Sequence, residues 1–181
     1  MERIINCKIE GIAPLLQHKL SLAVEAGLDS KTKKRAGQAK EDNPEEFLYV
    51  DKEGNIVQPS EHILQAVIKK MSNYKIQGRG KKTYKELAQG CINICPEFIK
   101  HEFPEWDADV RTVVIPATKG RTVRKRPKFD KWALNFAIHL FNDEMPIEVL
   151  KGALDDAGRE SGIGDYRPRF GRFMVTQFEV L

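Results

Sequence analysis

The sequence predicts a single α+β domain whose six strong elements follow the order strand, helix, strand, strand, helix, strand. Two stretches, residues 3–10 and 132–140, alternate apolar and polar side chains as half-buried strands do. Two others, residues 59–71 and 146–157, carry apolar side chains at helical spacing. A length of 181 residues fits one domain with insertions better than two domains.

The first strand is predicted at residues 3–10, because its apolar side chains fall on one face and its polar ones on the other. Pro14 then ends strand pairing in an apolar turn, since proline has no N–H to donate. Residues 18–46 are polar, charged and poor in periodic apolar positions. We expect them to form a mobile surface insertion.

A short hairpin and a helix follow the insertion. Residues 47–50 and 56–57 are the expected arms of the hairpin, with Gly54 and Asn55 supplying positive φ angles at its turn. The helix is expected to begin with Ser60 as its N-terminal cap and to bury one apolar stripe. This stripe consists of Ile63, Leu64, Val67, Ile68 and Met71.

The pattern assigns no clear structure to residues 75–109. Residues 110–115 are then a predicted strand, ended by Pro116, and the longest period-two alternation of the chain covers residues 132–140. We expect these two strands to pair as a hairpin whose protruding tip, residues 116–130, carries a basic run.

A second helix and a last strand complete the predicted domain. The helix starts at Pro146, and Gly158 and Gly162 mark its end. The last strand covers residues 172–180. Its two faces carry Phe173 and Val175 on one side and Met174, Phe178 and Val180 on the other. With right-handed crossovers, this order gives a ferredoxin-like (RRM-like) βαββαβ core with the first and third strands central.

The composition is that of a soluble globular protein, with 41% apolar and 31% charged residues. The sequence contains no apolar run long enough for a membrane span and no signal-peptide pattern, so we expect a cytoplasmic protein without a membrane partner. The three cysteines are an odd number, which predicts free thiols and no disulfide framework.

The net charge of +4 is small, but the positive charges are clustered. Six of the ten residues from Lys119 to Lys128 are basic and none is acidic, and another basic cluster surrounds Tyr74 and Tyr84. Such patches on a nearly neutral chain indicate contact with a polyanion. The alternative for each run is a loop whose charges are merely solvated.

The stretch GIGDYRPRFGRF, residues 162–173, combines glycines, aromatic rings and arginines directly before the last strand. Glycine permits positive φ and close approach of another backbone, guanidinium groups suit phosphate oxygens, and aromatic rings stack on bases. We predict that this turn and the basic run bind single-stranded nucleic acid. The candidate contacts are Gly162, Gly164, Tyr166, Arg167, Arg169, Phe170, Gly171, Arg172, Lys119, Arg121, Arg124, Lys125, Arg126 and Lys128. The alternative is a purely structural connection whose arginines pair with surface carboxylates.

Both ends of the chain resemble a known family. GIGDYRPRFGRFMV is similar to the glycine-rich loop of the RAMP superfamily, the ferredoxin-like RNA-binding proteins of CRISPR effector complexes. CKIEGIAPLLQH is similar to the first strand and turn of its backbone subunits. The two ends also resemble phage and prophage proteins that begin G-x-x-PLL-x-H and finish with the GIGDYRPRFGRF pattern. The RAMP resemblance implies RNA binding and polymerisation along the strand.

Asp165, Tyr166 and Pro168 depart from the RAMP loop, which carries serine, threonine and further glycines there. Asp165 would repel a phosphate unless a neighbouring arginine pairs with it.

Catalysis and metal binding have weaker signals. His18 is the one weak catalytic candidate, because imidazole titrates near neutrality and processing nucleases of the superfamily use histidine. No partner for it is identifiable by spacing, which favours a structural histidine. Cys91, Cys95 and His101 lack the second ligand pair that structural zinc needs, so we expect no metal and no cofactor.

We therefore expect a non-catalytic protein that binds single-stranded nucleic acid, RNA rather than DNA, and self-associates along the strand in a phage or mobile element. One alternative is a metal-independent endoribonuclease of the same superfamily. Another is a phage assembly or host-interaction protein that has kept the fold without binding nucleic acid.

Overall fold

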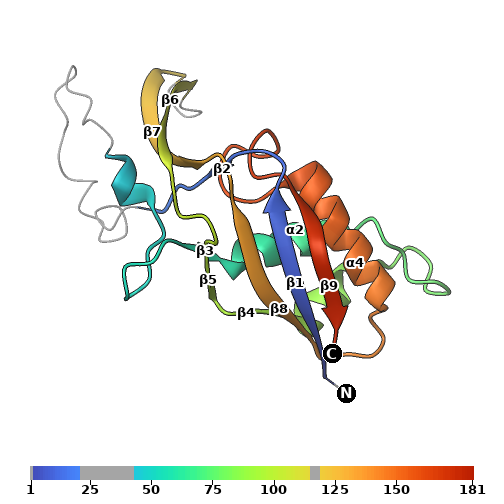
Figure 1. Ribbon diagram of the computed structural model, residues 1–181. Helices are drawn as coiled ribbons and strands as arrows, with labels where there is room; N and C mark the ends of the chain where they lie inside the picture. Colours follow the sequence, from blue (N-terminus) through green and yellow to red (C-terminus); the bar gives the residue numbers. More distant parts are fainter. Residues whose placement is uncertain (1, 21–42, 115–118) are drawn as a thin grey trace, which may run out of the picture.

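The computed structural model describes residues 2–20, 43–114 and 119–181 and contains a four-stranded antiparallel sheet with two helices on one face (Figure 1). From edge to edge, the strands are β4 (Ile92–Cys95), β8 (Ala133–Leu140), β1 (Arg3–Gly11) and β9 (Phe173–Val180). The helices are α2 (Ser60–Met71) and α4 (Ile147–Asp156). The first and third core strands, β1 and β8, are central, which confirms the predicted ferredoxin-like fold class.

The core lies between the sheet and the two helices. Ile5 and Ile9 of β1 are fully buried, and they pair with Ile138 and Leu134 of β8. The helices bury most of their predicted apolar stripes against this surface. The buried helix residues include Ile63, Val67, Met71, Leu150, Ala153 and Leu154. The apolar face of the sheet and the apolar stripes of the two helices thus pack together into one core.

The predicted pairing of residues 110–115 with 132–140 is wrong. The partner of β8 at the sheet edge is β4, and β6 (Asp107–Val114) instead pairs with β7 (Arg121–Phe129) in a separate hairpin that rises from the body (Figure 1). A strand under the helices needs apolar side chains at alternate positions, which Ile92 and Ile94 of β4 provide. In β6, the alternate positions on the more buried face include Asp109 and Arg111, which are charged and unsuited to the core. Most of the basic run therefore forms a strand, not the tip of a hairpin.

The predicted faces of the last strand are also partly wrong. In β9, Val175 pairs with Ile9 and Phe178 pairs with Cys7, so Thr176 is an extra residue that forms a β-bulge. The bulge returns Phe178 to the same face as Val175, and both side chains pack against the core. One inserted residue reverses the alternation beyond it.

The remaining elements connect the sheet to the hairpin. They are β2 (Leu15–Leu16), which pairs with β7; β3 (Val57–Pro59), which pairs with β5 (Phe98–Lys100); α3 (Lys85–Cys91); and a 3-10 turn, η2 (Pro44–Phe47). The predicted insertion at 18–46 lies mostly in residues 21–42, outside the described residues. Ser60 is the first residue of α2 and forms no side-chain cap, so that prediction is wrong.

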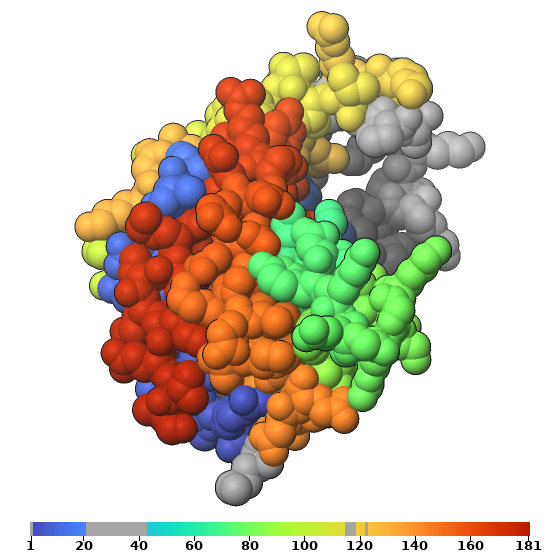
Figure 2. Space-filling view, turned by 90° about the vertical axis from the view of Figure 1, so that its right-hand side faces the viewer, coloured from blue at the N-terminus to red at the C-terminus, as the bar shows by residue number. Residues whose placement is uncertain are grey.

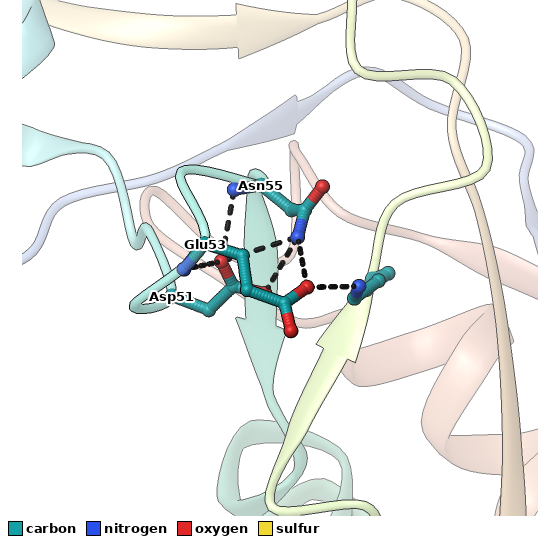
Figure 3. A network of polar contacts seen from close by, with 4 residues as sticks. Asp51, Glu53 and Asn55 are labelled. Carbon is teal, nitrogen blue, oxygen red and sulfur yellow. Dashed lines mark hydrogen bonds and ion pairs between the residues drawn. The ribbon is translucent and has the colours of Figure 1, made fainter.

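The predicted short hairpin around Gly54 is present only in part: Val50 bridges Ile56, and Gly54 has a φ of 87°, but Asn55 has no positive φ and Phe47 lies in η2. Polar contacts hold its turn (Figure 3). The Asp51 carboxylate accepts hydrogen bonds from the backbone N–H groups of Glu53 and Asn55, both at 2.9 Å. The Lys100 ammonium lies 3.0 Å from the Glu53 carboxylate. The Asn55 side-chain amide also donates to the two carboxylate oxygens of Asp51, at 3.2 and 3.0 Å. This side-chain bond is the largest cause of the lowered pKa of Asp51, and the two backbone bonds add to it. The acidic loop thus already holds a cation, the Lys100 amine.

Within the described residues, no helix combines the length and apolar character that crossing a membrane requires.

Candidate nucleic-acid interface

The glycine-arginine turn, residues 162–172, connects the helical layer to β9. α4 continues into a π-helical turn, η3 (Ala157–Ser161), which ends at Gly162 with a φ of 66°. The turn then packs on the chain that follows β1. The Gly171 N–H donates to the Pro14 carbonyl at 2.7 Å, and the Asp165 N–H donates to the Leu16 carbonyl at 2.8 Å. The two terminal motifs of the sequence are therefore neighbours in space.

The glycines of the turn make room for the protein's own backbone. A Cβ at Gly171 would lie 1.8 Å from the Ile163 carbonyl oxygen, and Gly171 has a φ of 73°. Gly162 and Gly171 are buried, and their amides donate hydrogen bonds within the protein. These two amides are thus removed from the predicted contact surface. Gly164 is half-buried, and its missing Cβ lets the Leu16 carbonyl approach.

The outer part of the turn is open to solvent. Arg167, Arg169 and Arg172 are exposed, and within the described part of the chain none of them forms a salt bridge. Tyr166 is 43% exposed and has a φ of 57°, a left-handed conformation that is rare for a residue with a side chain. The exposed part of the turn therefore carries three unpaired guanidinium groups and one aromatic ring.

One ion pair joins the hairpin to the turn, and a second orders Arg111 within β6. Arg126 of β7 is buried and its Nε lies 2.6 Å from the Asp165 carboxylate. The expected obstacle at Asp165 is thereby neutralised, and Arg126 is withdrawn from the predicted contacts. Arg111 of β6 binds Asp109 through two hydrogen bonds, at 2.5 and 2.6 Å.

Arg111 is a member of this site that the sequence analysis missed. Its guanidinium carbon lies 4.7 Å from the centroid of the Phe170 ring and 5.3 Å from that of Tyr166. Phe170 is 7% exposed, so its ring supports Arg111 from inside and is not available to a base. The D-x-R spacing of Asp109 and Arg111, which puts both side chains on one strand face, was the available signal.

The hairpin carries its basic residues on both faces. Arg124 and Arg126 share the face of Arg111 and Asp109, while Arg121 and Lys125 pair with Val114 and Val110 on the other face. Lys119 and Arg121 are exposed, and Lys128 lies 3.2 Å from the Asp130 carboxylate. The turn and the hairpin lie against each other in the space-filling view, where they are orange-red and yellow (Figure 2).

The histidines lie in other surroundings. His18 is half-buried, and its ring stacks on Phe47 with a centroid distance of 4.6 Å. His101 is buried beside Gln17, and burial lowers its pKa to about 4. All three cysteines are free thiols, and no three His, Cys, Asp or Glu side chains of the described residues gather into a metal-binding group. His18 therefore has the environment of a packed ring.

No family model and no curated protein matches the sequence. Among solved structures, the chain is similar to a chain in the cryo-EM structure of the Type III-B Cmr-beta bound to cognate target RNA, with a TM-score of 0.50 and 14% sequence identity. The likeness agrees with the ferredoxin-like arrangement of strands and helices described above. The match covers 99% of this chain and 61% of that chain. At this identity, the likeness concerns the fold alone.

Proposed function

We propose that the protein binds single-stranded nucleic acid, RNA rather than DNA, through the outer part of the turn and the basic hairpin, and does not cleave it. One observation carries the proposal: Arg167, Arg169 and Arg172 are exposed on the same turn as Tyr166 and have no salt-bridge partner in the described part of the chain. When unpaired cations of a protein neutralise phosphates, the nucleic acid releases its bound counterions. This release is the main source of sequence-independent affinity for nucleic acid.

The choice of a single strand rests on Tyr166. An exposed ring can stack on a base only if the base is accessible, as it is in single strands. The solved structure with a similar fold has RNA as its ligand, which makes RNA the first ligand to test. The hairpin adds the exposed cations Lys119 and Arg121.

We further propose that copies of the protein align along the bound strand, as the RAMP resemblance implies. The hairpin rises from the body and exposes Val110, Val114 and Val123, each more than half accessible, so it offers apolar area for a neighbouring copy. Light scattering with RNA strands of increasing length tests this, and a complex of one copy at every length would contradict it. An origin in phage or mobile elements rests on the resemblance of the two chain ends.

Fluorescence anisotropy with a labelled unstructured RNA, at several salt concentrations, tests the binding itself. We expect the wild type to lose affinity steeply with salt. Replacing Arg167, Arg169 and Arg172 by alanine should weaken binding and reduce the salt slope by about 2, since each single-strand phosphate contact contributes about 0.7.

A matched control is the triple alanine variant of Lys81, Lys82 and Lys85, which removes the same charge from an exposed cluster outside the site. If both variants lose the same RNA affinity, the effect comes from net charge alone, and the turn is not part of the binding site. The RNA recovered from these mixtures should be intact. Cleavage that is lost in His18→Ala would replace the binding proposal by the endoribonuclease.

A further inference from the structure

A cavity of about 510 Å³ opens between the C-terminal part of α2 and the glycine-arginine turn. In Figure 2 the orange-red turn lies above the blue-green surface of α2 on this side of the molecule. The volume is in the range of sites that hold small organic ligands. The lining residues are Lys69, Lys70, Glu160, Ser161, Gly164, Asp165, Tyr166, Arg167 and Pro168.

The charges around this cavity do not cancel. Lys70 lies 2.5 Å from the Glu160 carboxylate, and Asp165 is paired with Arg126 at 2.6 Å. Both carboxylates of the lining are therefore neutralised by their own partners. Lys69 and Arg167 remain, and the structure gives neither of them an ion pair within its described residues. The cavity thus has an excess of two positive charges and suits an anion.

The positive charge of Arg167, on the turn, lines this cavity together with that of Lys69, on α2. It contributes to the lowered pKa of His62, after the larger effect of burial. The two cations therefore reach the cavity from two sides, the turn and α2.

Tyr166 gives the cavity an aromatic wall that is fixed in place. Its ring meets the edge of the Phe170 ring at a centroid distance of 6.0 Å, and the guanidinium groups of Arg111 and Arg126 lie 5.3 and 6.0 Å from its centroid. These contacts hold a side chain that remains 43% exposed. A preorganised ring next to two cations matches a ligand that is planar at one end and anionic at the other.

We propose that this cavity is a subsite for a single nucleotide, whose base stacks on Tyr166 and whose phosphate lies between Lys69 and Arg167. The inference deepens the proposed function and rests on it for the source of the nucleotide, a unit of the bound strand. Lys69, on α2, is assigned to the site for the first time by this geometry.

Titration of the full chain with adenosine 5′-monophosphate, followed by NMR, tests the subsite without a polymer. We expect weak, saturable binding, and about tenfold weaker binding of ribose 5-phosphate, which has the phosphate but no base. Tyr166→Leu should bring both ligands to the same affinity, whereas Tyr166→Phe keeps the ring and should preserve the preference. Lys69→Ala should weaken both ligands, and Lys52→Ala, at an exposed lysine outside the basic clusters, should weaken neither.

Absence of saturable adenosine 5′-monophosphate binding to the wild type would overturn the subsite, as would an unchanged preference in a folded Tyr166→Leu protein. The two proposals fail in different ways. If RNA binds through the turn but the mononucleotide does not bind, the subsite is wrong and the proposed function stands. If the mononucleotide binds but RNA does not, the subsite is a small-molecule site and the proposed function is wrong.

Discussion

The turn and hairpin at one end of the protein contrast with the open face of the four-stranded sheet. On the sheet face, Lys8 lies 2.9 Å from the Glu102 carboxylate and 3.4 Å from that of Glu10, and His139 lies 2.6 Å from Glu2. At the turn, the outer arginines have no such partners in the described chain. Both surfaces are polar, but only one of them keeps unneutralised positive charge.

Under the proposed function, the ligand of this ferredoxin-like domain binds away from the open face of the sheet. RRM domains with this topology read RNA through aromatic side chains on the open sheet face. Here the open-face neighbours of Lys8 on β1, β8 and β9 are Asn6, Asn135 and Gln177, which are not aromatic. The features that suit a nucleic acid lie instead at the end of the sheet, where the chain leaves α4 and enters β9.

The largest expected effect comes from Gly171→Ala, because the new Cβ would meet the Ile163 carbonyl at a positive φ. We expect a loss of about 3 kcal/mol or more in the free energy of unfolding, measured by urea denaturation, together with weaker RNA binding. Gly90→Ala is the control, since its Cβ would meet nothing within 4 Å on α3. It should gain about 0.5–1 kcal/mol. Equal stabilities of the two variants would show that the turn is not held by its glycines.

A smaller effect is expected from Asp109→Ala, which leaves Arg111 without its bidentate partner. We expect a loss of about 2 kcal/mol in the free energy of unfolding and a weaker attachment of the hairpin to the turn. A double-mutant cycle with Arg111→Ala isolates the energy of the pair. If the cycle shows no coupling, the Asp109–Arg111 pair does not stabilise the hairpin.

Lys8→Ala should change RNA affinity by no more than about twofold, because that ammonium is already paired on the sheet face. The anisotropy titration used for the turn variants measures this directly. A loss as large as that of the triple arginine variant would remove the contrast between the two surfaces and move the site to the sheet.

The smallest effect concerns the pH dependence of the same sheet-face pair. The hydrogen bond from Lys8 is the first cause of the lowered pKa of Glu102, and the bond to Glu102 is the first cause of the raised pKa of Lys8. The pair therefore stabilises the fold above the unfolded pKa of Glu102 and below that of Lys8. This contribution is lost as pH falls through the folded pKa of Glu102 or rises through that of Lys8. Thermal unfolding of Glu102→Gln should differ slightly from wild type at neutral pH and not at low pH, and a difference that persists in acid would contradict the assignment.

Local periodicity was sufficient to predict most of the core elements. The alternation at residues 3–10 and 132–140 and the stripes of α2 and α4 depend only on which side chains a strand or helix must bury. The order of these elements then gave the topology. The nearness of the two terminal motifs follows from that topology as well, because β1 and β9 are neighbours in the sheet.

Which strands pair, and which charges are neutralised by a partner, depended on the tertiary structure. The choice of β4 over β6 as the edge strand, the bulge at Thr176 and the ion pair between Arg126 and Asp165 all join residues distant in sequence. No local pattern specifies such partners, because the free energy of each pairing depends on what else is buried beside it. For the same reason, the sequence shows where the arginines are, but only the fold decides which of them are already neutralised.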